Sequence, residues 1–290
     1  MADDIYPFKV GSFQCTAVND GNMAYTPPMF PPPNIFLFAN APGESLGQVL
    51  REHGIQPEQW AAWESPFISL VVNTGSHLVL VDTGAGDFVP TTGKLIPNLK
   101  AAGIAPEDID RVIITHGHPD HVRGNIDSNG KPAFPNARYV MLREEWDFWT
   151  TEKAEQTVAE HLRETLIKYA RENLPPVQRQ LDLVDDGAEI VPGIKAIAAP
   201  GHTPGHMILS ITSEGEQLLC VSDMVLHPIH LEHPEWFAAV DTLPEQVVAT
   251  RRRILGKAAS DNALLIAFHF PFPGLGHVVP KGDAWQWQPL

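Results

Sequence analysis

The sequence predicts an α/β protein whose strands form two β-sheets, and three observations lead to this fold class. Short apolar runs of strand length are interspersed with segments of helical composition along the 290 residues. These elements fall into two comparable halves, one before and one after about residue 180. No short-period repeat, low-complexity tract or linker interrupts them. We therefore expect residues 1–290 to form a single domain.

The first half is expected to begin with an irregular, proline-rich arm over residues 1–65, packed on the rest of the domain. Prolines are densest in TPPMFPPPN, residues 26–34, where they fix φ and remove backbone donors. From residue 67 the pattern changes to short apolar runs. These predict a hairpin of strands 67–72 and 77–82, a helix 96–103 that ends at a glycine, and buried strands 111–115 and 138–142.

The second half is introduced by a long helical segment. Residues 143–173 contain strong helix formers and stop at Leu174-Pro175-Pro176, because a residue before proline disfavours helical geometry. Further apolar runs then predict strands 194–199, 207–212 and 217–222, a helix 243–257 and a last strand 263–268.

Composition excludes several classes of protein. The 20 Lys and Arg against 35 Asp and Glu give a formal net charge of −15, a field that repels nucleic acid. Only Cys15 and Cys220 are present, which excludes a disulfide-rich secreted module and a cysteine-based zinc finger. We expect no signal peptide and no membrane span, and therefore a cytoplasmic location.

The histidines are concentrated at one place. The stretch THGHPDH, residues 115–121, carries three histidines and one aspartate directly after a predicted strand. His116 and His118 alternate and so share a face, whereas Asp120 and His121 offer a second direction, enough for a second metal. Imidazole and carboxylate groups suit zinc, and they also accept manganese, cobalt or iron.

Four other predicted strands end at a polar residue in the same way. Asp82 follows one, His202 and His206 follow another, and Asp223 and His269 each follow a further strand. Each of these signals is weak alone, but their order and spacing together indicate one site.

The ordered set VDTG, THGHPDH, PGHTPGH, VSD and AFH resembles the signature motifs of the metallo-β-lactamase-fold hydrolases, from Asp82 to His269. The resemblance implies an αβ/βα sandwich of two mixed sheets flanked by helices, with a dinuclear metal site at their open edge. It implies a hydroxide that bridges the metals as the nucleophile, with Asp120 and Asp223 as the catalytic carboxylates. Asp82 would orient a ligand without binding metal itself. One metal would take His116, His118 and His202, the other Asp120, His121 and His269, and Asp223 would bridge them.

The resemblance also narrows the activity to hydrolysis of small neutral esters, lactones or organophosphate triesters. Antibiotic-hydrolysing β-lactamases usually place Cys or Ser at the motif where Asp223 stands. Lactonases of the family usually carry Tyr three positions later, where this chain has Leu226. The segments 241–255 and 269–277 look most like methyl parathion hydrolases. The alternatives are an acyl-homoserine lactonase and a mononuclear-iron persulfide dioxygenase.

Residues beyond the metal ligands are predicted from weaker signals. His206 is interpreted as a packing or hydrogen-bonding residue at a strand end, with a contact to a metal ligand or to substrate as the alternative. Phe88, Trp149, Leu226 and Phe270 are candidates for an apolar pocket around a small-molecule substrate. The apolar segment 25–38 suits a two-fold interface, so we expect a homodimer.

Overall fold

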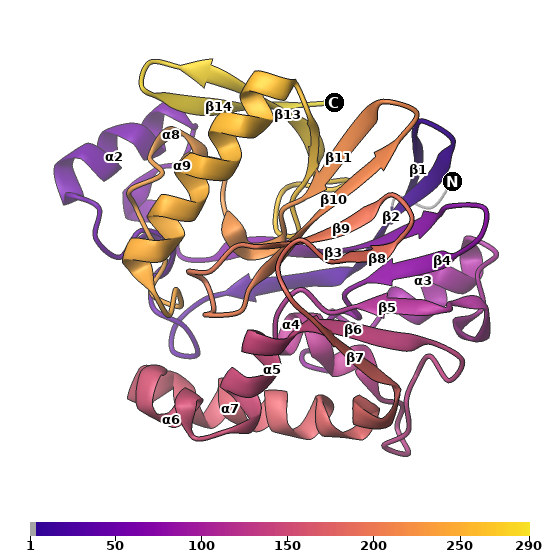
Figure 1. Ribbon diagram of the computed structural model, residues 1–290. Coiled ribbons are helices and arrows are strands. Elements are labelled where there is room, and N and C mark those ends of the chain that lie inside the picture. Colours follow the sequence, from indigo (N-terminus) through magenta and orange to yellow (C-terminus); the bar gives the residue numbers. More distant parts are fainter. Residues whose placement is uncertain (1–3) are drawn as a thin grey trace.

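Two β-sheets lie face to face in the computed structural model, which describes residues 4–290. Helices cover the outer face of each sheet, with α9 on one side of the molecule and α5 to α7 on the other (Figure 1). This arrangement confirms the predicted sandwich of two mixed sheets flanked by helices.

The first sheet contains seven strands in sequence order. Strands β1 to β4 pair in antiparallel fashion, whereas β4 to β7 are parallel. Their bounds are β1 Ile5–Val10, β2 Phe13–Tyr25, β3 Trp63–Asn73, β4 Leu78–Val81, β5 Arg111–Ile113, β6 Arg138–Leu142 and β7 Leu181–Val184.

The second sheet also has seven strands, in the order β14 to β8. Only the β11–β12 pair is parallel. The bounds are β8 Glu189–Val191, β9 Ile194–Ala198, β10 Met207–Ser213, β11 Glu216–Cys220, β12 Leu264–Ile266, β13 Leu275–Lys281 and β14 Ala284–Pro289.

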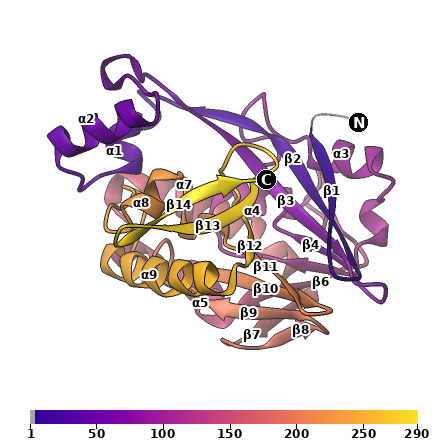
Figure 2. The same cartoon turned by 90° about the horizontal axis from the view of Figure 1, so that it is seen from above.

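Helices occupy the connections between strands. Their bounds are α1 Pro33–Leu37, α2 Gly43–Glu52, α3 Leu95–Ala101, α4 Pro119–Val122, α5 Arg143–Thr150, α6 Lys153–Thr157, α7 Glu160–Asn173, α8 Ile229–Glu232 and α9 Pro244–Asp261. Seen from above, α1 and α2 lie at one end of the molecule, away from the hairpin of β1 and β2 (Figure 2).

The main core lies between the sheets, because each sheet turns one apolar face toward the other. Leu70, Val79 and Ile113 from the first sheet pack with Met207 and Leu218 from the second. Burial of such aliphatic side chains stabilises the fold by about 1.5–3 kcal/mol each. A second cluster lies under α3, α5 and α7, and a third lies under α9.

Two sequence-based expectations were wrong. Residues 4–65 are not an irregular arm (residues 1–3 of that prediction lie outside the described residues), because β1 and β2 form an antiparallel hairpin and β2 pairs with β3. Its turn is at Gly11, whose φ is +53°. The single helix 143–173 is instead divided into α5, α6 and α7. Thr150 and Thr151 end α5, and their hydroxyl groups donate to the carbonyls of Trp146 and Asp147 at 2.7 and 2.6 Å.

Within residues 4–290, the structure has no helix that is both long and apolar enough to cross a membrane.

Candidate metal centre

The candidate ligands gather at one edge of the sandwich because of the strand directions. Strands β4 and β5 are parallel, so Asp82 and the loop that carries His116 leave the first sheet at the same edge. Strands β9, β11 and β12 run in one direction in the second sheet. Their carboxyl ends are followed by His202, Asp223 and His269, and the two sheets therefore bring all of these side chains together.

Two groups of ligand atoms result. The first consists of His116, His118, His202 and Asp223, and the second of Asp120, His121, Asp223 and His269. Within each group the ligand atoms lie within 4.8 Å of one another, and Asp223 belongs to both. Asp223 Oδ2 lies 3.3 Å from His202 Nε2 and 3.1 Å from His269 Nε2.

The chemistry of these atoms fits metal ions. His116 Nε2 and His118 Nε2 are buried and have no hydrogen-bond partner among residues 4–290. Buried polar atoms without a partner are costly, and a bound cation would satisfy them. Burial, together with neighbouring histidines, lowers the pKa of His116 and His118 well below the usual value. Both are therefore neutral near pH 7, the state in which imidazole binds metal.

Three ligand imidazoles are oriented by partners on their other ring nitrogen. His121 Nδ1 lies 2.8 Å from Asp82 Oδ2, and His202 Nδ1 lies 2.8 Å from Asp241 Oδ1. His269 Nδ1 lies 2.8 Å from the Ser65 hydroxyl. Such partners fix the tautomer and the ring orientation of a metal ligand. Asp82 thus lies where the motif suggested, whereas Asp241 and Ser65 were missed in the sequence.

Glu145 on α5 connects the two loops that carry the three histidine ligands of the first group. Its Oε1 accepts hydrogen bonds from Gly117 N at 2.8 Å and Trp149 Nε1 at 2.6 Å. Its Oε2 accepts from Thr203 Oγ1 at 2.6 Å and Gly205 N at 3.0 Å. A Cβ at Gly205 would lie 2.1 Å from Glu145 N, so only glycine permits this approach. Burial raises the pKa of Glu145, and the four donated bonds oppose that rise.

His206 supports the site without belonging to either ligand group. Its Nε2 accepts a hydrogen bond from Asp223 N at 3.2 Å. Burial, together with the nearby His202, lowers the pKa of His206 to about 3. This bond fits both interpretations of His206, a hydrogen-bonding residue at a strand end and a contact to a metal ligand, and it holds the backbone of the shared aspartate.

A cavity of about 330 Å³ opens beside the ligands His118, Asp120, Asp223 and His269. Phe88 and Leu226, two of the candidates for an apolar pocket, line it. The sequence interpretation was wrong for two other aromatic residues. Trp149 is buried behind His118, with ring centroids 5.6 Å apart, and Phe270 packs on Trp287 at 4.9 Å.

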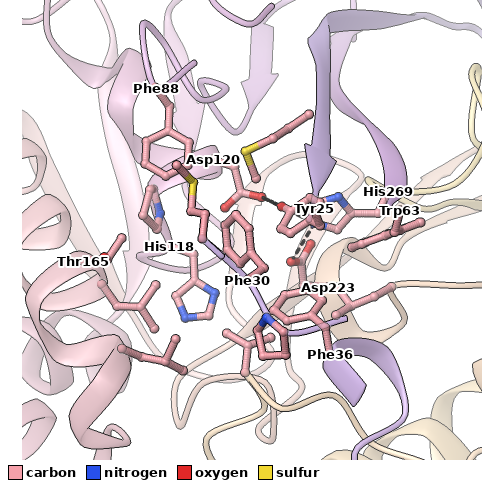
Figure 3. Close-up of a pocket in the computed structure, with 18 of the residues that line it drawn as sticks. Tyr25, Phe30, Phe36, Trp63, Phe88, His118, Asp120, Thr165, Asp223 and His269 are labelled. Atoms are coloured by element: carbon pink, nitrogen blue, oxygen red, sulfur yellow. Dashed lines mark hydrogen bonds and ion pairs between the residues drawn. The ribbon is translucent and has the colours of Figure 1, made fainter. Parts of the chain in front are cut away.

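The same cavity has aromatic walls that the sequence did not indicate (Figure 3). They come from the N-terminal region, which was expected to be irregular. Tyr25 ends β2, Trp63 begins β3, and Phe30 and Phe36 lie on or near α1. The Tyr25 hydroxyl points toward Asp120, with Oη 3.5 Å from Oδ2.

Comparison with known proteins agrees with this geometry. A family model described as the metallo-beta-lactamase superfamily matches residues 62–269, which is more than half of the chain. The chain belongs to the metallo-beta-lactamase superfamily. Among similar proteins, an N-acyl homoserine lactonase of Bacillus thuringiensis is 26% identical over 227 residues, covering 70% of this chain and 81% of that protein. An N-acyl homoserine lactonase of a Bacillus species is 30% identical over 171 residues, and the match spans only 59% of its length and 51% of this chain.

Two solved structures are similar over nearly the whole chain. AidC, described as a dizinc quorum-quenching lactonase in complex with a product, has a TM-score of 0.88 and 28% identity, covering 99% of this chain and 97% of AidC. The hydrolase AbOPH also has a TM-score of 0.88 and 28% identity, covering 100% of this chain and 98% of AbOPH.

Proposed function

We propose that this superfamily hydrolase uses two divalent metal ions to cleave small neutral esters, with lactones as the favoured class and organophosphate triesters as further substrates. The observation that carries the proposal is the pair of ligand groups that share Asp223. Zinc is the proposed metal, because imidazole and carboxylate ligands suit it and because the similar AidC is described as dizinc.

The ligand residues would determine the chemistry of the site. His116, His118 and His202 with Asp223 would hold one ion, and Asp120, His121 and His269 with Asp223 the other. When bound, the two cations would supply Lewis acidity and a hydroxide nucleophile near neutral pH. Neutral imidazoles leave most of the positive charge uncancelled, and this charge favours an oxyanion that develops in the transition state.

The cavity supports a neutral substrate. Apart from the candidate metal ligands, its walls are mostly aromatic or aliphatic side chains, and no Lys or Arg from the described part of the chain, residues 4–290, lines it. A wall of this kind offers no counter-charge to a dianionic phosphate monoester or to the carboxylate of a β-lactam. The similarity to AidC and to the Bacillus lactonases favours lactones within the neutral class.

A comparison of five substrates on one zinc-loaded preparation tests the proposal. An aliphatic lactone, p-nitrophenyl acetate and paraoxon are expected to have higher kcat/KM than nitrocefin and p-nitrophenyl phosphate. If nitrocefin or the monoester ranks first by about tenfold, which is about 1.4 kcal/mol in transition-state binding, the neutral-substrate proposal is refuted.

We also keep the homodimer and the cytoplasmic location as proposals. The structure changes the argument for the dimer, because Phe36, Leu37 and Phe38 are buried within the chain. Met29 and Ile35 remain 69% and 51% exposed, and they would be the apolar contribution to an interface.

The cysteines bear on the proposed cytoplasmic location. Both are free thiols and buried, which is compatible with a reducing compartment.

A further inference from the structure

Tyr25 brings an uncharged hydroxyl group to the second ligand group. Its Oη lies 3.5 Å from Asp120 Oδ2, and its ring meets the His269 ring edge-on at 6.4 Å. The side chain is 6% exposed and lines the cavity. Asp120 is its hydrogen-bond acceptor among residues 4–290, at a distance long enough for a closer oxygen to replace it.

An irregularity in β2 turns Tyr25 toward the metal centre. The pairing of β2 with β3 shifts between Asn19 and Asn22, so that β2 has one extra residue there. Because side chains alternate along a strand, one extra residue moves all later side chains to the opposite face. Gly21, at φ +124°, permits this bulge, and a Cβ there would lie 2.1 Å from the carbonyl oxygen of Thr91.

The bulge places Tyr25 opposite Trp63, on the face that also carries Ser65. Ser65 is the hydrogen-bond partner of His269, so this face is the one that meets the metal centre. Neighbouring aromatic rings then fix the phenol. The ring centroids of Phe30, Trp63 and Phe36 lie 4.7, 4.7 and 5.2 Å from that of Tyr25. A hydroxyl held in this way loses little further freedom when it binds a substrate.

We propose that the Tyr25 hydroxyl donates a hydrogen bond to the leaving oxygen of the substrate while the ester bond breaks. This inference rests on the proposed ester and lactone hydrolysis. The phenol lies beside Asp120 and His269 in the cavity wall, so a substrate bound at the second ligand group would bring its leaving oxygen within reach of the hydroxyl. Leu226, at the position where lactonases of the family usually carry Tyr, also lines the cavity, but its side chain has no polar group.

The bond is strongest in the transition state. As the bond to the leaving oxygen breaks, its electron pair moves onto that oxygen, and the donated hydrogen bond strengthens with the growing charge. Tyr25 keeps its proton, and the attacking water supplies the hydrogen that the product alcohol carries. An alkoxide from an aliphatic lactone needs this stabilisation, whereas p-nitrophenolate spreads its charge over its own ring.

The test compares Tyr25→Phe with the wild type on an aliphatic lactone and on p-nitrophenyl acetate. For the lactone we expect kcat to fall on the order of 30- to 100-fold with KM changed by less than about threefold, whereas the aryl ester should lose less than about fivefold. Metal content should equal that of the wild type. Calorimetric titration of the zinc-loaded protein with the ring-opened hydroxy acid should show weaker binding, because the product hydroxyl loses its donor.

Tyr139→Phe is the matched control. Tyr139 is also buried, and its hydroxyl donates to the Asn125 carbonyl at 3.3 Å, away from the cavity. This variant should retain the activity and the product affinity of the wild type.

Three results would overturn the inference. Equal losses on both substrates would mean that Tyr25 only positions its neighbours, loss of metal would mean that it only supports Asp120, and unchanged kcat on the lactone would remove any role. If wild-type protein hydrolyses neither substrate, the proposed function itself fails, and this result is known before the variants are compared.

Discussion

Replacing Glu145 with glutamine should loosen one metal-ligand loop and leave the other in place. The carboxylate accepts four hydrogen bonds, two on each oxygen. An amide keeps one oxygen, which will face Gly117 N and Trp149 Nε1, because both of these groups can only donate. The amide nitrogen then faces Thr203 and Gly205. The Thr203 hydroxyl can turn and accept, but Gly205 N–H meets another donor and is left unsatisfied.

The loss of stability in Glu145→Gln follows from the one unsatisfied donor, Gly205 N–H, and from the lost negative charge. One buried donor without a partner costs about 1–3 kcal/mol, and the three remaining bonds lose the contribution of the negative charge. We expect Glu145→Gln to lower the free energy of unfolding by about 2–4 kcal/mol. The loop with Gly205 also carries His202, so metal affinity at the group that contains His202 should fall about 10- to 100-fold.

Chelator competition and urea unfolding measure both effects. Glu144→Gln is the matched control, since Glu144 precedes Glu145 on α5 and its side chain is 60% exposed. It should change stability by less than about 0.5 kcal/mol. The binding step that weakens in Glu145→Gln should be the step that His202→Ala abolishes. Unchanged stability, or weakening of the other step, would refute the role of Glu145 as the link between the loops.

Further predictions concern the shared ligand, acidity and assembly. Asp223→Ala should lose at least one metal ion and nearly all activity, and elemental analysis that finds both ions retained would contradict the shared-ligand assignment. Although burial opposes it, hydrogen bonds that the imidazole donates to Asp223 and Asp241 raise the pKa of His202 to about 9 in the metal-free protein. Because metal must displace this proton, the apparent metal affinity should fall as pH decreases from about 9, and a pH-independent affinity between pH 6 and about 8 would argue against this protonation. Light scattering at micromolar concentration should find a dimer, and a monomer would remove the role given to Met29 and Ile35.

The motifs that resemble those of the family indicated the candidate metal ligands, and strand order accounts for four of them. Once several strands end at the same edge of a sandwich, polar residues at those ends must meet, as His116, His202, Asp223 and His269 do. His118, Asp120 and His121 depend in addition on the loop and the short helix α4 that follow β5, and the resemblance, not strand order, indicated them.

The groups around the ligands depend on details that a pattern does not carry. Tyr25 reaches the centre only because a bulge reverses the alternation of β2, and the residues near it were expected to be irregular. The run Asn19-Asp20-Gly21-Asn22, whose residues are unfavourable in a regular strand, was the available signal. Glu145 lies in the first turn of α5, where an acidic residue is ordinarily exposed, and only the structure shows its burial.

The most direct test of the two-metal site is a titration of metal-free protein with zinc while lactone hydrolysis is followed. Asp223 belongs to both ligand groups, so one carboxylate would serve both ions and full activity is expected only when both groups are filled. We predict that activity rises until about two equivalents of zinc per chain have been added and is then constant. Full activity at one equivalent, with no further change at the second, would contradict the dinuclear account.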